Sequence, residues 1–429
     1  MKALVLGGVT LNGGDAAIAQ GQRRILASHW PDVELVTADM QPEAARRYFP
    51  SETFVPWYFD LFVSRPLSSP LARRVARRLP SLRPLLMRRA LRAGEALARK
   101  RWSWWALTLN ADQRRQLRTM LEADLVVYCG GTSLTENYDL APKLFDIELA
   151  RVMAKPYVYM QQSAGPFTDP ANRSRLQQQF ASAALVILRD QRSLEHVTDL
   201  GVAPEHCLVL PDTAFSLASE HLDAPEPPAA PTRIAVSVRE WKFFTGTDAE
   251  TGMRHYVESL ASLVTGLVRD HGCEVVFVST CQGRPEYWTD DYATAVRLVD
   301  TLPADVAERV TVDRRARTAT ELIDFLATFH ALVATRLHAA ILGACAGLPT
   351  LAIAYEYKSQ EVWRQLGLEQ FVIDIEDVSP SRLSRAVDDL LAERQEVRAV
   401  LRERVPELRD AALSAAPAIS HALAAQAVA

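Results

Sequence analysis

The amino-acid sequence predicts an α/β protein with two Rossmann-like domains that face each other across a cleft. Short apolar runs rich in β-branched residues alternate with segments of helical periodicity, a pattern typical of parallel sheets buried on both faces. The alternation stops before residue 222 and begins again after residue 232. A chain of 429 residues is long enough for two such domains, each with its own core.

The predicted strands form two series. The first comprises Leu4–Leu6, Val33–Thr37, Asp124–Tyr128, Pro156–Met160 and Ala184–Leu188. The second comprises Arg233–Val238, Glu274–Ser279, Arg309–Val312, Ala331–Thr335 and Pro349–Ala354. Between them, the segment LDAPEPPAAPT at 222–232 contains four prolines and predicts a stiff interdomain linker. We therefore expect domains at 1–221 and 233–429, the second ending in helices from Pro380 onward.

Positive charge is concentrated in one window of the first domain. Residues 65–118 hold fifteen Lys and Arg but two acids, a net charge of +13, whereas the whole chain carries −4. Apolar residues recur there at helical spacing, and Trp102, Trp104 and Trp105 follow. Such a basic helical insertion suits peripheral contact with an anionic membrane or a polyanionic ligand. It suits equally an insertion whose Arg stems cover apolar surface. No recognisable nucleic-acid module frames it, so no nucleic acid is expected.

Composition excludes several other classes of protein. The chain is 48% hydrophobic and 23% charged, as globular proteins are. No segment approaches the roughly 20 apolar residues of a membrane-spanning helix, and the N-terminal segment lacks the pattern of a signal peptide. Five scattered cysteines without a CxxC pair disfavour a zinc site and a disulfide framework, so no metal ligand is expected. A cytoplasmic location follows, with the inner face of the membrane as the alternative.

Glycine-rich segments follow two strands of the first series. One is GGVTLNGGD at residues 7–15, and the other is Gly130-Gly131-Thr132-Ser133. Neither has the spacing of a dinucleotide fingerprint or a P-loop, so each is either a ligand-facing loop or a tight turn. At the end of a parallel strand the hydroxyls of Thr132 and Ser133 are expected to point into the cleft.

Charged residues also follow predicted strands. Arg189 and Asp190 end one strand, where they either contact substrate or form a local ion pair and helix cap. In the second domain, Arg239 ends the first strand. Glu356 and Lys358 lie just past the last strand, at the expected cleft edge.

Arg336 and His338 stand where a strand passes into a helix of small residues. A guanidinium, an imidazole and the N–H groups of a helix N-terminus would converge there on an anion. A buried structural histidine is the alternative for His338.

The ordered segments GGVTLNGGD, CGGTSL, QSAGPF, SVREW, TRLHAAILGACAGLP and AYEYKSQ together resemble the polysaccharide pyruvyl transferase family over nearly the whole chain. The resemblance implies transfer of pyruvate from phosphoenolpyruvate, as a ketal, to two hydroxyls of one sugar in a cell-surface polysaccharide or its lipid-linked precursor. It implies a fold similar to the glycosyltransferase-B architecture. Phosphoenolpyruvate is then a co-substrate, and no cofactor is expected.

The resemblance also suggests roles for residues. It implies donor binding by Arg239, Arg336, Leu337 and His338. We add Lys358 to the donor-binding residues from its place at the expected cleft edge, and His338 is the candidate general acid because it lies beside the predicted anion site. Acceptor-binding residues, expected in the first domain, are Asn12, Gly14, Asp15, Gly131, Thr132, Ser133 and Glu136, with Asp15 as a candidate base.

Three other functions remain open from the sequence. The main alternative is a glycosyltransferase that uses a nucleotide sugar, because the same architecture serves that chemistry. A domain that binds a glycan or a membrane without catalysis is the second. The third is recruitment of the scaffold to another phosphoenolpyruvate-dependent or small-molecule pathway.

Overall fold

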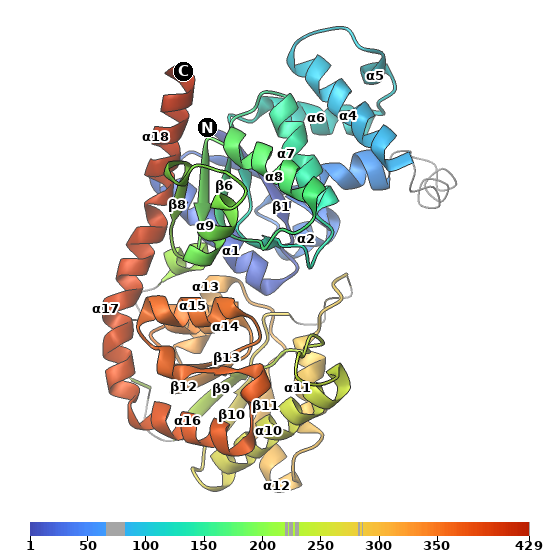
Figure 1. Ribbon diagram of the computed structural model, residues 1–429. Helices are drawn as coiled ribbons and strands as arrows, with labels where there is room; N and C mark the ends of the chain where they lie inside the picture. The colour runs from blue at the N-terminus through green and yellow to red at the C-terminus, as the bar shows by residue number, and fades with distance from the viewer. Residues whose placement is uncertain are drawn as a thin grey trace. The chain divides into compact units, whose positions relative to one another are not determined.

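The computed structural model describes residues 1–65, 82–218, 222, 226–227, 231–281, 284 and 286–428. The chain divides into two compact units, each built on its own parallel sheet (Figure 1). Unit 1 contains Met1–Thr10, Gln22–Thr213 and Ala412–Ala429, and unit 2 contains Leu11–Gly21 and Ala214–Ala411. These two Rossmann-like sheets confirm the predicted fold class.

The units differ from the predicted domains in two places. The segment Leu11–Gly21 belongs to unit 2, because Ala17 packs in the core of unit 2 and the Gly13 N–H donates to the Thr280 carbonyl at 3.1 Å. The C-terminal residues from Ala412 belong to unit 1, where Leu423 and Tyr157 line the same surface pocket. Both segments were expected in the opposite domain.

The sheet of unit 1 has eight strands, which pair in parallel throughout. Their order is β3-β2-β1-β4-β6-β7-β8, with β5 pairing β6 outside this path. The strands are β1 (Lys2–Gly8), β2 (Glu34–Asp39), β3 (Thr53–Pro56), β4 (Leu125–Tyr128), β5 (Gly131–Leu134), β6 (Tyr157–Ala164), β7 (Leu185–Leu188) and β8 (Cys207–Val209).

The sheet of unit 2 has six parallel strands in the order β11-β10-β9-β12-β13-β14. They are β9 (Arg233–Ser237), β10 (Glu274–Phe277), β11 (Val310–Val312), β12 (Ala331–Ala334), β13 (Thr350–Ala354) and β14 (Val372–Asp374). This is the doubly wound order of a Rossmann fold, in which chain order reverses between the first and fourth strands, here β9 and β12. Ligands bind at the carboxyl ends of the strands beside such a reversal.

Helices connect the strands of both sheets. Unit 1 contains α2 (Pro42–Tyr48), η1 (Asp60–Ser64), α4 (Arg83–Ala98), α5 (Trp104–Leu107), α6 (Ala111–Glu122), α7 (Ala141–Val152), α8 (Pro170–Ser182), α9 (Gln191–Thr198), η3 (Pro204–His206) and α18 (Ala415–Val428). Unit 2 contains α10 (Ala249–Arg269), α11 (Asp291–Val299), α12 (Ala304–Ala307), α13 (Ala319–Leu326), α14 (Leu337–Cys345), α15 (Tyr357–Leu366), η6 (Glu369–Phe371), η7 (Ile375–Asp377) and α16 (Pro380–Ala392). Three helices contain residues of both units: α1 (Gly13–His29), η4 (Thr213–Leu217) and α17 (Arg394–Leu413).

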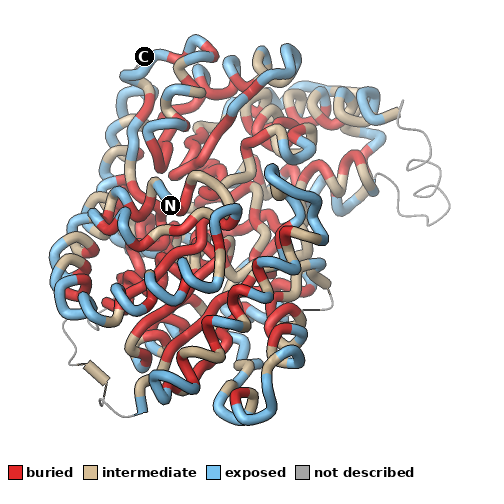
Figure 2. The backbone as a smooth tube through the Cα atoms, turned by 60° about the horizontal axis from the view of Figure 1, so that its bottom comes forward, coloured by how far each residue is buried: buried red, intermediate tan, exposed pale blue. Residues whose placement is uncertain are grey.

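The ten predicted strands are all present, and their apolar runs are mostly buried in a sheet, except that the residues of β11 are half-buried or exposed. Every residue of β4, β7 and β12 is buried, and Figure 2 shows buried residues in red along the backbone. The strands β3, β5, β8 and β14 were not predicted. They have only three or four residues each and lack an uninterrupted buried apolar run.

Two predicted segments are described only in part. The basic insertion 65–118 includes α4, α5 and most of α6, which confirms its helical character there, while residues 66–81 lie outside the described residues. Of the predicted linker 222–232, the structure describes residues 222, 226, 227, 231 and 232. Among the helices that the structure describes, none combines the length and the apolar composition needed to span a membrane.

Candidate active site

Charged side chains gather at the carboxyl ends of the strands of unit 2, where its strand order reverses. Arg239 follows β9, and Arg336 follows β12, the strand that pairs with β9. The two parallel strands end at the same edge of the sheet, so both arginines are positioned at the reversal point. Sequence reasoning placed them there for this reason.

Arg336 is held by a buried carboxylate. It is 7% exposed and immediately precedes α14, and its Nε and Nη2 donate to the two carboxylate oxygens of Asp291 at 2.9 and 2.5 Å. Burial lowers the pKa of Arg336, but the attraction of Asp291 outweighs burial and raises that pKa above its ordinary value. Arg336 therefore stays charged. Asp291 occupies the Nε–Nη2 edge of the guanidinium. The sequence suggested that Arg336 binds a substrate anion, but this edge is not available for that contact.

Arg239 has a different environment. Its guanidinium lies 4.1 Å from the ring centre of Tyr355 and 5.1 Å from that of Trp241. Burial raises the pKa of Asp291, and the charges of Arg336 and then Arg239 oppose this effect. Within the described ranges, Arg239 forms no ion pair, so the aromatic rings position a cation whose hydrogen-bonding edge is available to an anion.

The glycine-rich first turn of α1 packs against the same site. A Cβ atom at Gly13 would lie 2.1 Å from the Thr280 carbonyl oxygen, and one at Gly14 would lie 2.7 Å from Nδ1 of His338. Real Cβ atoms do not approach so closely, so only glycine allows these contacts. The first turn of α1 therefore faces the candidate acid His338, at the N-terminus of α14.

Asn12, the residue before α1, fixes the start of this helix. Its Oδ1 accepts the Gly14 N–H at 2.9 Å, and its Nδ2 donates to the Tyr287 hydroxyl at 3.0 Å. Burial raises the pKa of Tyr287, and the negative charge of nearby Asp15 raises it further. Burial also raises the pKa of Cys281 to about 11, so its thiol stays protonated at neutral pH. Asn12, Gly14 and Asp15 thus lie in unit 2 with the predicted donor residues, not in a separate acceptor domain.

Two further predicted donor residues are engaged within the fold. Lys358, in the first turn of α15, is mostly buried and donates to Glu356 at 2.7 Å. Leu337 lies in the hydrophobic core of unit 2, so its side chain serves packing. Only its backbone N–H, in the first turn of α14, is suited to an anion.

Sequence reasoning missed Asp291 and Tyr287. Neither follows a predicted strand, which was the signal used for every charged candidate in unit 2. A weaker signal was present for Asp291. The preceding Asp290 accepts the Ala293 N–H and so caps α11, which leaves the second carboxylate of the pair unexplained by helix capping.

The remaining predicted acceptor residues lie in unit 1, and their structure differs from the expected turn. Gly131, Thr132 and Ser133 belong to the short strand β5. The Thr132 hydroxyl accepts from Nη2 of Arg189 at 2.8 Å, and the Ser133 hydroxyl lies 3.1 Å from that of Tyr128. Both hydroxyls therefore have hydrogen-bond partners within unit 1, and their contact with an acceptor stays a prediction.

Asp190 has the helix-capping role weighed as an alternative to substrate contact, whereas Arg189 forms its ion pair with Asp212 and not with the neighbouring Asp190. Arg189 is 5% exposed and donates to Asp212 and to Ser163, both at 2.6 Å. Asp190 caps α9 by accepting the Ser193 N–H at 2.7 Å.

Glu136 is engaged at the start of α8. Its carboxylate accepts the Thr168 N–H and hydroxyl at 2.7 and 2.6 Å, the Asp169 N–H at 3.0 Å and Nδ2 of Asn172 at 3.1 Å. Burial raises the pKa of Glu136, but these hydrogen bonds, first those from Thr168, lower it to about 2. The carboxylate therefore stabilises this helix start.

Cysteines and metal ligands show no further site. All five cysteines, which lie within the described ranges, are buried, and none of them is in a disulfide. Among the described residues, no three His, Cys, Asp or Glu side chains come together as a metal site requires.

Comparison with known proteins identifies the family of this chain. The chain matches the polysaccharide pyruvyl transferase family over residues 12–357, and it belongs to that family. It is 30% identical over 424 residues to the amylovoran biosynthesis protein AmsJ of Erwinia amylovora, covering 94% of this chain and 97% of AmsJ. The family identifies a transferase, and both matches support a role in polysaccharide biosynthesis.

Solved structures share the fold at low sequence identity. A glycosyltransferase from Rickettsia africae superposes with a TM-score of 0.58 at 10% identity, covering 98% of each chain. A putative UDP-N-acetylglucosamine 2-epimerase from Listeria monocytogenes superposes with a TM-score of 0.57 at 12% identity, covering 99% of this chain and 95% of its own. These similarities show a fold of the glycosyltransferase-B type and nothing about the substrate.

Proposed function

We propose that this protein transfers pyruvate from phosphoenolpyruvate, as a ketal, to two hydroxyls of one sugar in a cell-surface polysaccharide or its lipid-linked precursor. The observation that carries the proposal is the convergence of Arg239, Arg336 and His338 at the strand-order reversal of unit 2, in a chain of the pyruvyl transferase family. We further propose that it acts in the cytoplasm.

Donor binding is assigned to three groups of unit 2. Arg239, positioned by Tyr355 and Trp241, offers the available guanidinium edge. Arg336 offers Nη1, because Asp291 takes its other two nitrogens. The N–H groups in the first turn of α14 add partial positive charge. A small donor with a phosphate and a carboxylate needs this number of cationic and N–H groups.

The reaction forms two C–O bonds and breaks one. The methylene carbon of phosphoenolpyruvate takes a proton, one sugar hydroxyl adds to the neighbouring carbon, and the bond from that carbon to the phosphate oxygen breaks. The second hydroxyl then completes the ketal. The two hydroxyl protons account for the proton on the new methyl group and for the one on the released phosphate.

His338 is the proposed acid that protonates the methylene carbon. It lies in the first turn of α14, two residues after Arg336, and its Nδ1 faces the backbone of Gly14. Asp15 is the proposed base for a sugar hydroxyl, because it follows Gly14 and its charge acts on Tyr287 in the same cluster. The acceptor is accordingly assigned to the side of the site formed by Asn12 and Asp15. No acceptor contact is assigned to Gly131, Thr132, Ser133 or Glu136.

The experiment is incubation of the purified chain with phosphoenolpyruvate and a panel of hexose-containing acceptors, including lipid diphosphate-linked ones. Acceptor-dependent release of inorganic phosphate, together with one pyruvyl ketal in the product mass, is expected. The main alternative, a nucleotide-sugar glycosyltransferase, predicts instead the release of a nucleoside diphosphate from a nucleotide sugar. That outcome, without phosphate release from phosphoenolpyruvate, would overturn the proposal.

A His338→Ala variant tests the role of the imidazole. Loss of a general acid lowers kcat by about 10²- to 10⁴-fold. The matched control is His271→Ala, because His271 is a partly exposed histidine of the same unit that pairs with Asp388 at 3.3 Å. Near-normal turnover of His338→Ala at saturating phosphoenolpyruvate would remove His338 from the mechanism while leaving the overall reaction intact.

A further inference from the structure

The surface formed by α4 and α5, residues 83–107, exposes large apolar side chains that a globular surface usually buries. Within the described ranges, eleven large apolar residues are exposed, and five of them lie in this short stretch. These five are Leu85, Leu97, Trp102, Trp104 and Leu107. Trp102 and Trp104 are each 70% exposed, and their rings lie 5.0 Å apart. Such a concentration of exposed apolar area marks an interaction surface.

Helix α4 is attached to unit 1 by its small residues. Its buried positions are Ala90, Ala93 and Gly94. A Cβ atom at Gly94 would lie 2.8 Å from Cδ1 of Leu149 on α7, so α4 approaches α7 closely at this point. The core therefore takes the small face of α4, and the helix keeps Leu85 and Leu97 outside.

The same surface is strongly cationic. Residues 83–107 contain seven Lys and Arg and one acid, Glu95, which pairs with Arg92 at 3.2 Å and with Arg99 at 3.4 Å. Arg89 is used internally, since its Nε donates to the Thr108 hydroxyl at 2.7 Å and so ties α4 to the end of α5. The cations Arg83, Arg88, Arg92, Arg99, Lys100 and Arg101 are exposed.

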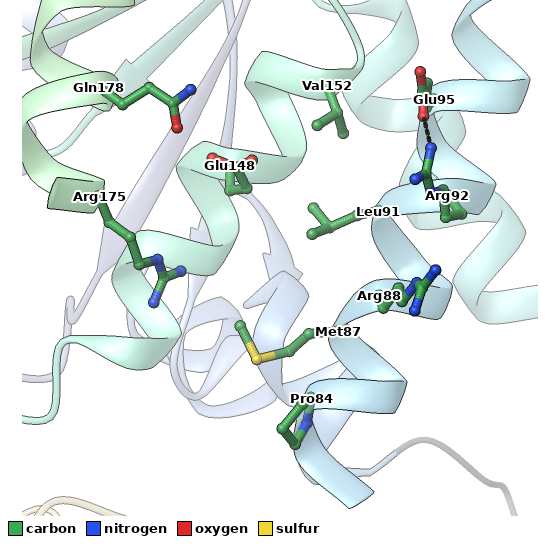
Figure 3. Close-up of a pocket in the computed structure, with 10 residues that line it drawn as sticks. All are labelled: Pro84, Met87, Arg88, Leu91, Arg92, Glu95, Glu148, Val152, Arg175 and Gln178. Atoms are coloured by element: carbon green, nitrogen blue, oxygen red, sulfur yellow. Dashed lines mark hydrogen bonds and ion pairs between the residues drawn. The ribbon is translucent and has the colours of Figure 1, made fainter. Parts of the chain in front are cut away.

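A groove runs along α4 beside this surface. It has a volume of about 720 Å³ and is lined from α4, α7 and α8. Figure 3 shows Met87 and Leu91 pointing from α4 toward α7, with Arg175 on the side of α8. Apolar side chains inside the groove and cations at its edges repeat the composition of the exposed surface.

We propose that the α4–α5 surface binds the face of an anionic phospholipid bilayer. Trp102, Trp104 and Leu107 enter the interfacial layer, and the surrounding arginines contact lipid phosphates. Tryptophan favours this layer because its ring is apolar and its N–H is polar, and Arg can hold its charge at the lipid headgroups while its stem lies in the apolar layer. A soluble polyanion would use the cations but gain nothing from Leu85 and Leu107, so the membrane accounts for both features.

The test is co-sedimentation of the full chain with vesicles of phosphatidylcholine, with and without phosphatidylglycerol. We expect binding that requires phosphatidylglycerol and weakens at least tenfold between 50 mM and 500 mM salt, because this tenfold rise in salt shortens the Debye length about threefold. The double variant Trp102→Ala/Trp104→Ala should lower binding at least tenfold. Trp288→Ala, which removes a tryptophan of unit 2 that is 74% exposed, is the matched control and should bind normally.

A second variant and a second readout separate the membrane from other partners. Arg88→Gln/Arg92→Gln/Arg99→Gln should remove the salt-dependent part of binding, and brominated lipid should quench the fluorescence of the parent more than that of the Trp102/Trp104 variant. Absence of binding to phosphatidylglycerol vesicles, or binding unchanged in both variants, would overturn the proposal. So would a change of oligomeric state in the Trp variant, which would identify a protein interface. Pyruvyl transfer to a soluble acceptor is measured in parallel, so failure here and failure of the proposed reaction are distinguishable.

Discussion

Each unit of this protein buries an arginine–aspartate pair near the carboxyl end of a parallel strand, and the two pairs differ in what surrounds them. In unit 1, Arg189 after β7 pairs with Asp212 at 2.6 Å. In unit 2, Arg336 after β12 pairs with Asp291 at 2.5 Å. All four side chains are buried, so burial alone does not distinguish the two pairs.

The difference lies in the use of the guanidinium nitrogens. Arg189 donates from Nε to Ser163, from Nη1 to Asp212 and from Nη2 to Thr132, so the fold uses all three nitrogens. Arg336 donates from Nε and Nη2 to the single carboxylate of Asp291. Because Nη1 of Arg336 is not used by that carboxylate, and His338 lies two residues away, the pair of unit 2 suits a reacting anion. The pair of unit 1 suits structure alone.

The largest expected effect comes from replacing each arginine by methionine. Arg336→Met and Arg189→Met each remove the ion-pair partner of a buried aspartate, which costs about 3–5 kcal/mol of stability. The two variants are expected to differ in activity. Per folded molecule, we expect Arg189→Met to keep phosphoenolpyruvate-dependent phosphate release and Arg336→Met to lose it by about two orders of magnitude or more, in line with loss of a group that acts on the transition state.

Urea unfolding measures the first quantity, and phosphate release at a temperature where both variants are folded measures the second. Adding Asp212→Asn to Arg189→Met, and Asp291→Asn to Arg336→Met, removes the aspartate charge that has lost its ion-pair partner. Both double variants should recover part of the stability. Activity should not return with Asp291→Asn. Equal losses of activity in Arg189→Met and Arg336→Met would contradict the proposed difference in function between the two pairs.

Sequence reasoning identified the arginine of each buried pair but not its aspartate, because the ends of strands can be predicted from the amino-acid sequence. Apolar runs such as Leu125–Tyr128 and Ala331–Ala334 identify buried parallel strands, and residues just after them must lie at one edge of the sheet. That geometry placed Arg239, Arg336 and His338 correctly in relation to the strands. It could not identify Asp291, which lies 45 residues before Arg336 and follows no predicted strand.

The membership of Asn12, Gly14 and Asp15 in unit 2 was also beyond the sequence pattern. Hydrophobic periodicity shows that the loop follows β1, but not which core its next helix enters. The contacts that decide this are the close approach of Gly13 to Thr280 and the packing of Ala17 in the core of unit 2. Likewise, the hydroxyl of Thr132 could not be seen from the sequence to serve Arg189.

A smaller effect is expected at Gly14, and it tests whether the surroundings of Arg336 are built for chemistry. A Cβ atom there would lie 2.7 Å from Nδ1 of His338, so Gly14→Ala should cost about 1–3 kcal/mol by overpacking and displace the imidazole. We expect kcat to fall and its pH profile to change.

The matched control is Gly272→Ala, where nothing lies within 4 Å of the added Cβ but φ is +67°. That variant should lose about 1 kcal/mol from backbone strain and keep kcat; an unchanged pH profile in Gly14→Ala would count against His338 as the acid.

The smallest expected effect concerns Glu136, which tests whether the polar groups of unit 1 serve structure. Hydrogen bonds at the start of α8 lower its pKa from 4.5 to about 2 against the opposing effect of burial. A carboxyl with a lowered folded-state pKa contributes stability that is fully present above its unfolded pKa and is lost as pH falls through its folded pKa. The parent should therefore be more stable than Glu136→Gln above pH 4.5, by up to about 1 kcal/mol because the group is partly solvated, and this advantage should vanish as the pH falls to about 2. Urea midpoints of both proteins across this range measure the difference. Loss of acceptor-dependent turnover in Glu136→Gln without the predicted change in stability would instead place an acceptor contact in unit 1 and break the contrast between the two units.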